Sequence, residues 1–155
     1  MTRSTMIDDT VRELAAAGNL ALLTTLLPDG YPQTHVVWID HDDECLLVNT
    51  EVHRTKFTNT QRDPKVSVVL VDAADHHRYV ELRGDVVDVV RGEAARAHID
   101  ELSRKYRGHD YDPAIIRSER AVLRIAPRRR VLVRGRHWTG LDAGPARTPD
   151  RLTGG

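Results

Sequence analysis

The chain has 155 residues, the size of one domain with a substantial core, and its 23 Lys and Arg residues balance its 23 Asp and Glu residues. Zero net charge provides no overall field to attract nucleic acid or an anionic membrane surface, so we expect neither as a partner. A single cysteine, Cys45, excludes an internal disulfide, and the sequence shows neither a signal peptide nor the roughly 18 apolar residues of a membrane span, so we expect a cytoplasmic protein.

The spacing of apolar residues predicts short strands interrupted by three helices. In chain order the predicted elements are a helix at 8–18, strands at 20–27, 33–39 and 45–50, a helix at 53–62, strands at 66–71 and 78–90, a helix at 93–106 and a strand at 121–133. The turn Pro28-Asp29-Gly30 joins the first two strands as a hairpin. The run at 66–71 is nearly all β-branched, which is typical of a strand covered on both faces. Gly84 in the middle of a long strand indicates a bulge or bend that curls the sheet.

These elements predict a mainly β (α+β) fold, a barrel of six or seven mostly antiparallel strands with two or three helices. We expect residues 1–136 to form this domain and residues 137–155, rich in Gly, Pro and Thr, to form a mobile C-terminal tail. Several strands are apolar on both faces, more than one small barrel interior needs. We therefore expect a homodimer in which Val37, Trp38 and Tyr79 cover the partner subunit.

The segment Arg54-Thr55-Lys56 carries the most chemical information. The chain has 20 arginines and only three lysines, so a lysine here departs from a strong preference for arginine. Arginine offers a planar fork for bidentate phosphate contacts, whereas lysine is a compact charge on a flexible stem. At the start of a short helix, whose free N–H groups already favour anions, the pair predicts a phosphate-binding corner. From charge alone, a solvated basic turn is the alternative.

Three motifs give the chain a family resemblance. They are Leu22-Leu23-Thr24-Thr25 leading to Asp29-Gly30-Tyr31-Pro32, then Arg54-Thr55-Lys56 with Asn59, and finally Arg62-Asp63-Pro64-Lys65-Val66-Ser67-Val68. With the elements in this order, residues 8 to 135 resemble the pyridoxamine 5′-phosphate oxidase-like split β-barrel superfamily. More narrowly, the chain looks like the flavin/deazaflavin oxidoreductase branch, which uses the deazaflavin coenzyme F420. Flavin-binding relatives that oxidise pyridoxamine phosphate tend to have the two basic residues adjacent, whereas Thr55 separates them here.

The resemblance implies a cofactor-binding role for ten residues in all, five of which belong to one segment. Arg54 and Lys56 match residues that hold the phosphate and acidic tail of F420, and Asn59 completes their motif. Asn49 and Thr50 match positions that hydrogen-bond the ring system or the tail.

The other five implied residues come from two further strands. Gln33, Val36 and Val37 match positions that lie along the cofactor ring. His77 stands where relatives often have an aromatic residue that reaches in from the partner subunit, and Tyr79 can take over that contact.

The resemblance therefore implies an F420-dependent oxidoreductase that transfers a hydride from reduced deazaflavin to a small conjugated or carbonyl-bearing molecule. Such chemistry needs binding, orientation and exclusion of water more than a catalytic dyad, and we identify no catalytic residue. His35, His77 and Tyr79 are candidate proton donors to the reduced substrate, with solvent as the favoured source. Two alternatives stay open: an FMN-dependent oxidase or reductase on the same fold, and a non-catalytic protein that binds or sequesters the cofactor.

Two further clusters are expected to have no ligand. His76 and His77 would point to opposite faces of a strand, and no cysteine or third histidine lies at a familiar spacing, so we expect no metal site. Arg128-Arg129-Arg130 is the strongest basic cluster, and it could meet a polyanionic cofactor tail or an RNA. Without interleaved aromatic residues it is a poor platform for nucleic acid. We interpret it as a strand edge protected by charge.

Overall fold

A computed structural model describes residues 6–135 and 137–140 of the chain. The helices are α1 (Asp9–Ala16), α2 (Thr55–Arg62) and α3 (Glu93–Arg107), with a 3-10 helix η1 (Pro113–Ile115). The strands are β1 (Ala21–Leu26), β2 (Pro32–Val37), β3 (Asp40–His41), β4 (Leu46–Glu51), β5 (Lys65–Val71), β6 (Arg78–Arg91), β7 (Arg120–Arg134) and β8 (His137–Gly140).

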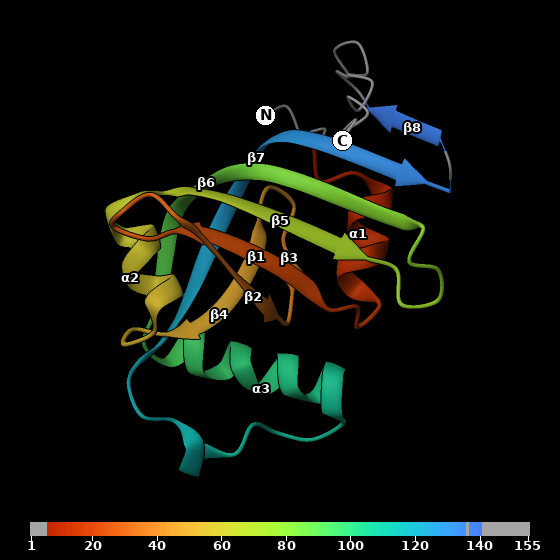
Figure 1. Cartoon of the computed structure of the whole chain (residues 1–155). Helices are drawn as coiled ribbons and strands as arrows, with labels where there is room; N and C mark the ends of the chain where they lie inside the picture. The colour runs from red at the N-terminus through yellow and green to blue at the C-terminus, as the bar shows by residue number, and fades with distance from the viewer. Residues whose placement is uncertain (1–5, 136, 141–155) are drawn as a thin grey trace, which may run out of the picture.

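The strands form one sheet with the order β2-β1-β5-β6-β7-β4-β3, and β8 pairs with the second half of β7. Among the described residues every pair of neighbouring strands is antiparallel. The long strands β6 and β7 curve across the molecule, so that β6 pairs with β5 and β7 pairs with β4 (Figure 1). The structure confirms the predicted barrel of mostly antiparallel strands with three helices.

The bend in β6 and β7 depends on Gly84. The pairing register shifts between Arg83 and Gly84, which confirms the predicted irregularity. A Cβ atom on Gly84 would lie 2.2 Å from the carbonyl oxygen of Ala126, so a side chain here would force the two strands apart. Pro127 pairs with Gly84 and has no N–H to donate, so the ladder is interrupted where the strands bend.

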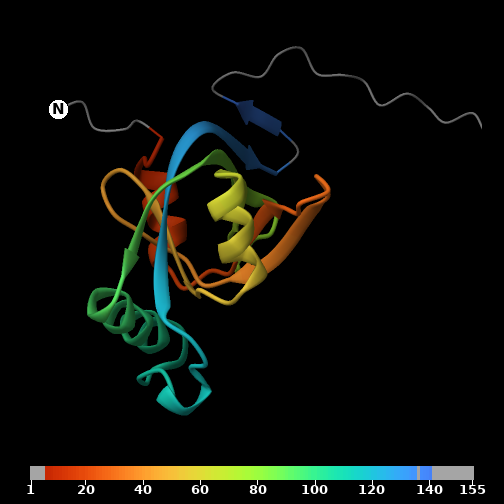
Figure 2. The ribbon, with the colours of Figure 1, turned by 90° about the vertical axis from the view of Figure 1, so that its left-hand side faces the viewer.

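The three helices cover different parts of the barrel. The Asp8 side chain caps α1 by accepting a hydrogen bond from the Val11 amide at 3.0 Å, as the sequence predicts. The buried face of α1 packs against β3 and β5, while α3 packs against β4, β6 and β7. Between β1 and β4, α2 closes one end of the barrel (Figure 2). Its first turn therefore lies at the rim of the barrel.

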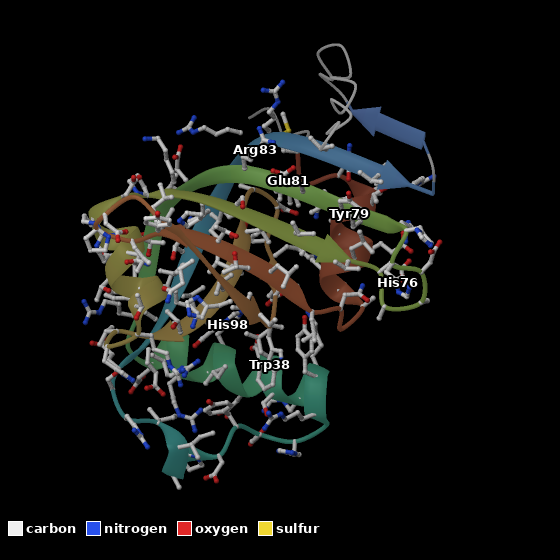
Figure 3. The ribbon with its side chains drawn as sticks, viewed as in Figure 1. Trp38, His76, Tyr79, Glu81, Arg83 and His98 are labelled. Atoms are coloured by element: carbon white, nitrogen blue, oxygen red, sulfur yellow. The ribbon has the colours of Figure 1, made fainter. Side chains whose placement is uncertain are left out.

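The outer face of the β2-β1-β5-β6 half of the sheet is less covered than the sequence predicts. Along β5, Val66 and Val68 are buried, whereas Val69 and Val71 on the opposite face are half-buried. The expectation that 66–71 is covered on both faces is therefore wrong for a single chain. Tyr79, Glu81 and Arg83 continue the same outer face along β6 (Figure 3).

Two predictions about the C-terminal region meet different outcomes. Residues 137–140, assigned to the tail, form β8 on the edge of β7, and residues 141–155 lie outside the described residues. In the basic cluster, Arg130 is only 6% exposed and pairs with Asp8 at 2.6 Å, so it is not part of a solvated edge. Arg128 pairs with Asp85.

None of the helices within the described residues is long and apolar enough to cross a membrane.

Candidate functional site

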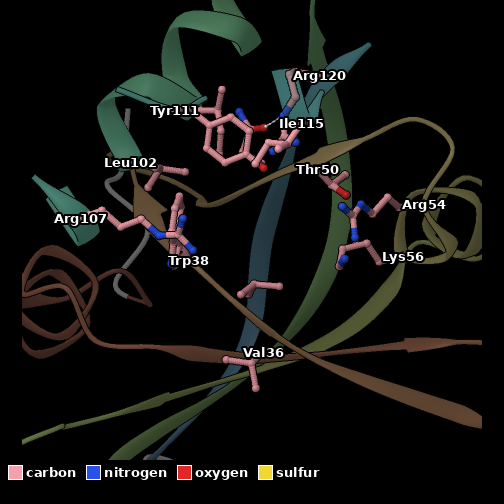
Figure 4. Close-up of a pocket in the computed structure, with 13 residues that line it drawn as sticks. Val36, Trp38, Thr50, Arg54, Lys56, Leu102, Arg107, Tyr111, Ile115 and Arg120 are labelled. Carbon is pink, nitrogen blue, oxygen red and sulfur yellow. Dashed lines mark hydrogen bonds between the residues drawn. The ribbon is translucent and has the colours of Figure 1, made fainter. Parts of the chain in front are cut away.

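A cleft of about 220 Å³ opens between β2, the first turn of α2 and α3 (Figure 4). Four of its lining residues are basic and none is acidic, although the whole chain is electrically balanced. The lining residues are Val36, Val37, Trp38, Asn49, Thr50, Arg54, Lys56, Ile99, Leu102, Arg107, Tyr111, Ile115 and Arg120. This concentration of positive charge suits an anionic ligand.

The cationic end of the cleft consists of Arg54 and Lys56. Arg54 is the N-cap residue of α2 and makes no side-chain cap hydrogen bond, so the first amides of the helix have no side chain to accept from them. Lys56 is half-buried, and burial lowers its pKa, followed by repulsion from Arg54 and Arg120. Within residues 6–135 neither Arg54 nor Lys56 has an ion-pair partner. A bound anion would supply the missing counter-charge.

Arg120 lines the same cleft but is neutralised within the chain. It is 7% exposed, and its guanidinium donates to the Glu51 carboxylate at 3.2 Å and to Asn49 Oδ1 at 2.8 Å. Glu51 is fully buried and also accepts a hydrogen bond from the Arg117 amide at 3.3 Å. Arg120 is thus a structural cation with a fixed orientation.

A hydrogen-bonded chain from α3 fixes the amide of Asn49. Its Nδ2 donates to the Ala95 carbonyl at 2.9 Å and lies 3.1 Å from His98 Nδ1, while His98 Nε2 lies 3.0 Å from Asp40. His98 belongs to α3 and is labelled in Figure 3. With Nδ2 occupied in this way, the carbonyl oxygen of Asn49 faces Arg120 at the cleft.

The aromatic end of the cleft consists of Trp38, Arg107 and Tyr111. Trp38 stacks on Tyr106 with ring centres 5.3 Å apart, and Tyr111 meets it edge-on at 6.2 Å. The Arg107 guanidinium lies 5.1 Å from the centre of the Trp38 ring, and that of Arg120 lies 5.2 Å from the Tyr111 ring. Trp38, expected to cover a partner subunit, also packs within its own chain, and the expected partner contact stays a prediction.

Six of the ten residues predicted to bind the cofactor line the cleft. They are Val36, Val37, Asn49, Thr50, Arg54 and Lys56. They come from β2, β4 and the start of α2, which are separated in sequence but meet at the barrel rim. The sequence predicted the hairpin, the short helix and the order in which they follow one another.

Gln33 and Asn59 do not line the cleft. Gln33 is half-buried on β2, and its Oε1 is buried without a partner in the described part of the chain. Asn59 is 1% exposed, and its side chain donates to Thr25 Oγ1 at 3.0 Å and accepts from Arg62 at 3.1 Å. Within the chain Asn59 fastens α2 to β1, and its expected cofactor-binding role stays a prediction.

His77 and Tyr79 lie far from the cleft within one chain. His77 is exposed in the turn between β5 and β6, and Tyr79 follows near the start of β6, at the opposite end of the barrel from α2 (Figures 1 and 3). Their expected contact with the cofactor depends on a partner subunit and stays a prediction. No group of three or more His, Cys, Asp or Glu side chains within the described residues is placed to hold a metal ion.

The part of the cleft formed by Trp38, α3, the following loop and the start of β7 was not predicted. The residues missed are Trp38 as a lining residue, Ile99, Leu102, Arg107, Tyr111, Ile115 and Arg120. Ile99 and Leu102 lie three residues apart in the predicted helix at 93–106, a spacing that indicates one packed face but not which cavity that face borders. The loop after α3 carries no motif in the sequence.

His35 is a neighbour of the cationic end. Its Nδ1 is buried and has no hydrogen-bond partner within residues 6–135. Burial lowers the pKa of His35, and the positive charges of Lys56 and then Arg54 lower it further. The imidazole is therefore neutral near pH 7.

The family model described as pyridoxamine 5′-phosphate oxidase matches residues 7–134. The chain belongs to this family. The family consists of flavin- or deazaflavin-binding oxidoreductases, and its members bind FMN or F420. No curated protein matches the chain.

Three solved structures share the fold. An F420 reductase is 28% identical, with a TM-score of 0.69, and the match covers 77% of this chain and 94% of that one. A conserved hypothetical protein from Mycobacterium tuberculosis is 22% identical, with a TM-score of 0.65 and coverage of 88% and 91%. An FMN-binding, pyridoxamine 5′-phosphate oxidase-related protein from Nostoc punctiforme PCC 73102 is 14% identical, with a TM-score of 0.62 and coverage of 81% and 82%. The last two support the fold alone.

Proposed function

We propose that the protein is an F420-dependent oxidoreductase that transfers a hydride from reduced deazaflavin to a small conjugated or carbonyl-bearing molecule. The observation that carries this proposal is the half-buried Lys56 beside Arg54, without a carboxylate partner within residues 6–135. Such a pair is suited to the phosphate of a redox coenzyme. The Arg-Thr-Lys spacing and the 28% identity to an F420 reductase favour F420 over FMN.

The residues of the cleft fit a phosphorylated coenzyme with a planar ring. Arg54 and Lys56 would hold the anionic arm, and Val36 and Val37 offer an apolar strand surface for the ring. Thr50 Oγ1 is buried in the cleft wall without a hydrogen-bond partner in the described part of the chain. A ligand that hydrogen-bonds this hydroxyl would satisfy it, since buried polar groups usually have partners.

The chain contributes binding, orientation and exclusion of water. When bound, reduced deazaflavin supplies the hydride and its two electrons, and the acceptor gains that hydride and one proton. The apolar side chains of Ile99 and Leu102 limit water on the α3 side of the cleft. His35 is neutral near pH 7 because of its lowered pKa, so solvent is the favoured source of the proton.

We also propose that the protein is a homodimer. Cross-strand neighbours on the outer face form a half-exposed apolar surface, which includes Leu22, Val36, Val69, Val71 and Tyr79. Val36 is 62% exposed, so a partner seated there would border the cleft. Light scattering after size exclusion tests this, and a Val69→Glu variant should be monomeric if this face forms the interface.

Calorimetric titration with F420 and with FMN tests the choice of cofactor. We expect tighter binding of F420, and tighter binding of FMN would overturn the proposal. Stopped-flow oxidation of the reduced, protein-bound F420 by enones, quinones and nitro compounds then tests turnover. Inertness towards the whole panel would favour the alternative of a protein that binds the cofactor without catalysis.

A further inference from the structure

We propose that the aromatic end of the cleft is an acceptor subsite for a planar, conjugated molecule that carries a carboxylate. The subsite consists of Trp38, Arg107 and Tyr111, with Leu102 and Ile115 as apolar walls. This inference rests on the proposed function, because it names the class of molecule reduced at the same cleft.

Arg107 differs from the other arginines of its helix. Arg96 pairs with Asp100 at 2.8 Å, and Arg104 pairs with Asp110. Arg107, the last residue of α3, has no ion pair or hydrogen bond within residues 6–135, and its guanidinium lies over the Trp38 ring. It is a cation held in place by an indole and left without a counter-ion.

The position of Arg107 separates it from the cationic end. Figure 4 shows Arg107 and Trp38 on one side of the cleft and Arg54 and Lys56 on the other, with Val36 between them in that view. The cleft thus offers two separate places for negative charge.

The surroundings of Arg107 specify a flat ligand. The edge-on contact between Tyr111 and Trp38 and the side chains of Leu102 and Ile115 form apolar walls, and Ile115 is 49% exposed. A conjugated ring packs favourably against such walls. A carboxylate attached to that ring can accept two parallel hydrogen bonds from the guanidinium, and no acidic residue of the lining repels it.

The negative charge that pairs with Arg107 has two possible sources, the carboxylate of an acceptor or the acidic tail of the cofactor. The apolar walls favour the acceptor, since a flexible polar tail gains little from contact with Leu102, Tyr111 and Ile115. The two sources make different predictions for an Arg107 variant, because only the second links Arg107 to cofactor affinity.

The test uses trans-3-benzoylacrylate, a planar enone with a carboxylate, and its neutral amide as probes. Calorimetry with the cofactor-free protein should show tighter binding of the carboxylate than of the amide. In Arg107→Gln we expect the carboxylate to bind about tenfold more weakly, the size of one charge-assisted contact, with the amide and F420 unaffected. Arg107→Lys, which keeps the charge, should recover part of the loss.

Arg117→Ala is the matched control, because Arg117 is an exposed arginine that does not line the cleft. This variant should bind both probes like the wild type. Equal binding of the two probes by the wild type would overturn the proposal. A loss of F420 affinity in Arg107→Gln without a loss for the carboxylate would also overturn it and assign Arg107 to the cofactor tail. Because the probes are titrated without cofactor, a failure of F420 to bind would refute the proposed function separately.

Discussion

Arg120 and Lys56 are two cations of one cleft, and they differ in where their counter-charge lies. Arg120 is 7% exposed and is paired with Glu51, which has no exposed surface. Lys56 is half-buried near two other cations, with no acidic partner within residues 6–135. A cation that stabilises the fold is paired with a carboxylate of the same chain. A cation that binds a ligand lacks such a partner in the free protein, and the ligand supplies the negative charge.

The physical cost of the two arrangements differs as well. Removing water from a charged group is unfavourable, and in Arg120 the Glu51 carboxylate and the Asn49 carbonyl offset that cost. In Lys56 the cost stays uncompensated and appears as a lowered pKa. The free protein therefore gives up some stability at Lys56, and anion binding recovers it.

Glu51→Gln should have the largest effect, and it acts on stability. The variant leaves the buried Arg120 without a countercharge, and breaking a buried pair in this way costs about 3–5 kcal/mol of unfolding free energy. Urea denaturation monitored by circular dichroism measures the loss. Glu119→Gln is the control, because it breaks the exposed pair with Arg91 and should leave stability nearly unchanged. Equal effects of the two variants would contradict the assignment of Arg120 as a structural cation.

Lys56→Ala should weaken cofactor binding and leave the stability of the fold nearly intact, the opposite of Glu51→Gln. Loss of one charge-assisted contact is expected to weaken F420 binding by about 1.5–3 kcal/mol, while the fold survives and its stability is unchanged or slightly higher. Calorimetry and urea denaturation of the same preparation measure both quantities. Lys65→Ala, which removes an exposed lysine outside the cleft, should leave cofactor affinity unchanged. Unaltered affinity in Lys56→Ala would remove Lys56 from the site.

The contrast between the two cations also shows how far the sequence can predict the site. Lys56 was identified from its neighbours in the chain, because a helix start and a basic pair form a local pattern. Arg120 and Glu51 were not, because their pairing joins β7 to β4 across 69 positions. The sequence did not predict Arg107 and Tyr111 as site residues for the same reason, because their position at the cleft depends on the packing of α3 against the sheet.

The fold was more predictable than the site because its signals are local. The Asp8 cap, the β-rich runs and the glycine at the bend of β6 each occur within a few residues of the element that they specify. Errors arose where tertiary context decides. The apolar run of β5 predicted burial of both faces, yet only one face is buried in the single chain.

The pH dependence of F420 binding should follow the charge of Lys56. An anion favours the charged form and raises its pKa in the complex, so affinity should fall as pH rises through the pKa of the free protein. Because that pKa is lowered, the fall should begin at a lower pH than for an ordinary lysine. Titrations from roughly pH 7 to 10 measure the slope. In Lys56→Ala this part of the slope should vanish, and a persistent slope would point to another group.

Arg54→Lys should have the smallest effect, because it keeps the charge at the cationic end and changes only the geometry of the donors. Arg54 is exposed, and its planar fork is suited to a bidentate contact that an ammonium cannot reproduce. We expect F420 affinity to fall by about 0.5–1.5 kcal/mol, the net value of one hydrogen bond. A larger loss for Arg54→Ala than for Arg54→Lys, measured by calorimetry, would separate the contribution of charge from that of geometry. If both variants bind F420 like the wild type, Lys56 and the amides of α2 hold the anion without Arg54. Lys56 would then be the unpaired cation that binds the cofactor at this end of the cleft.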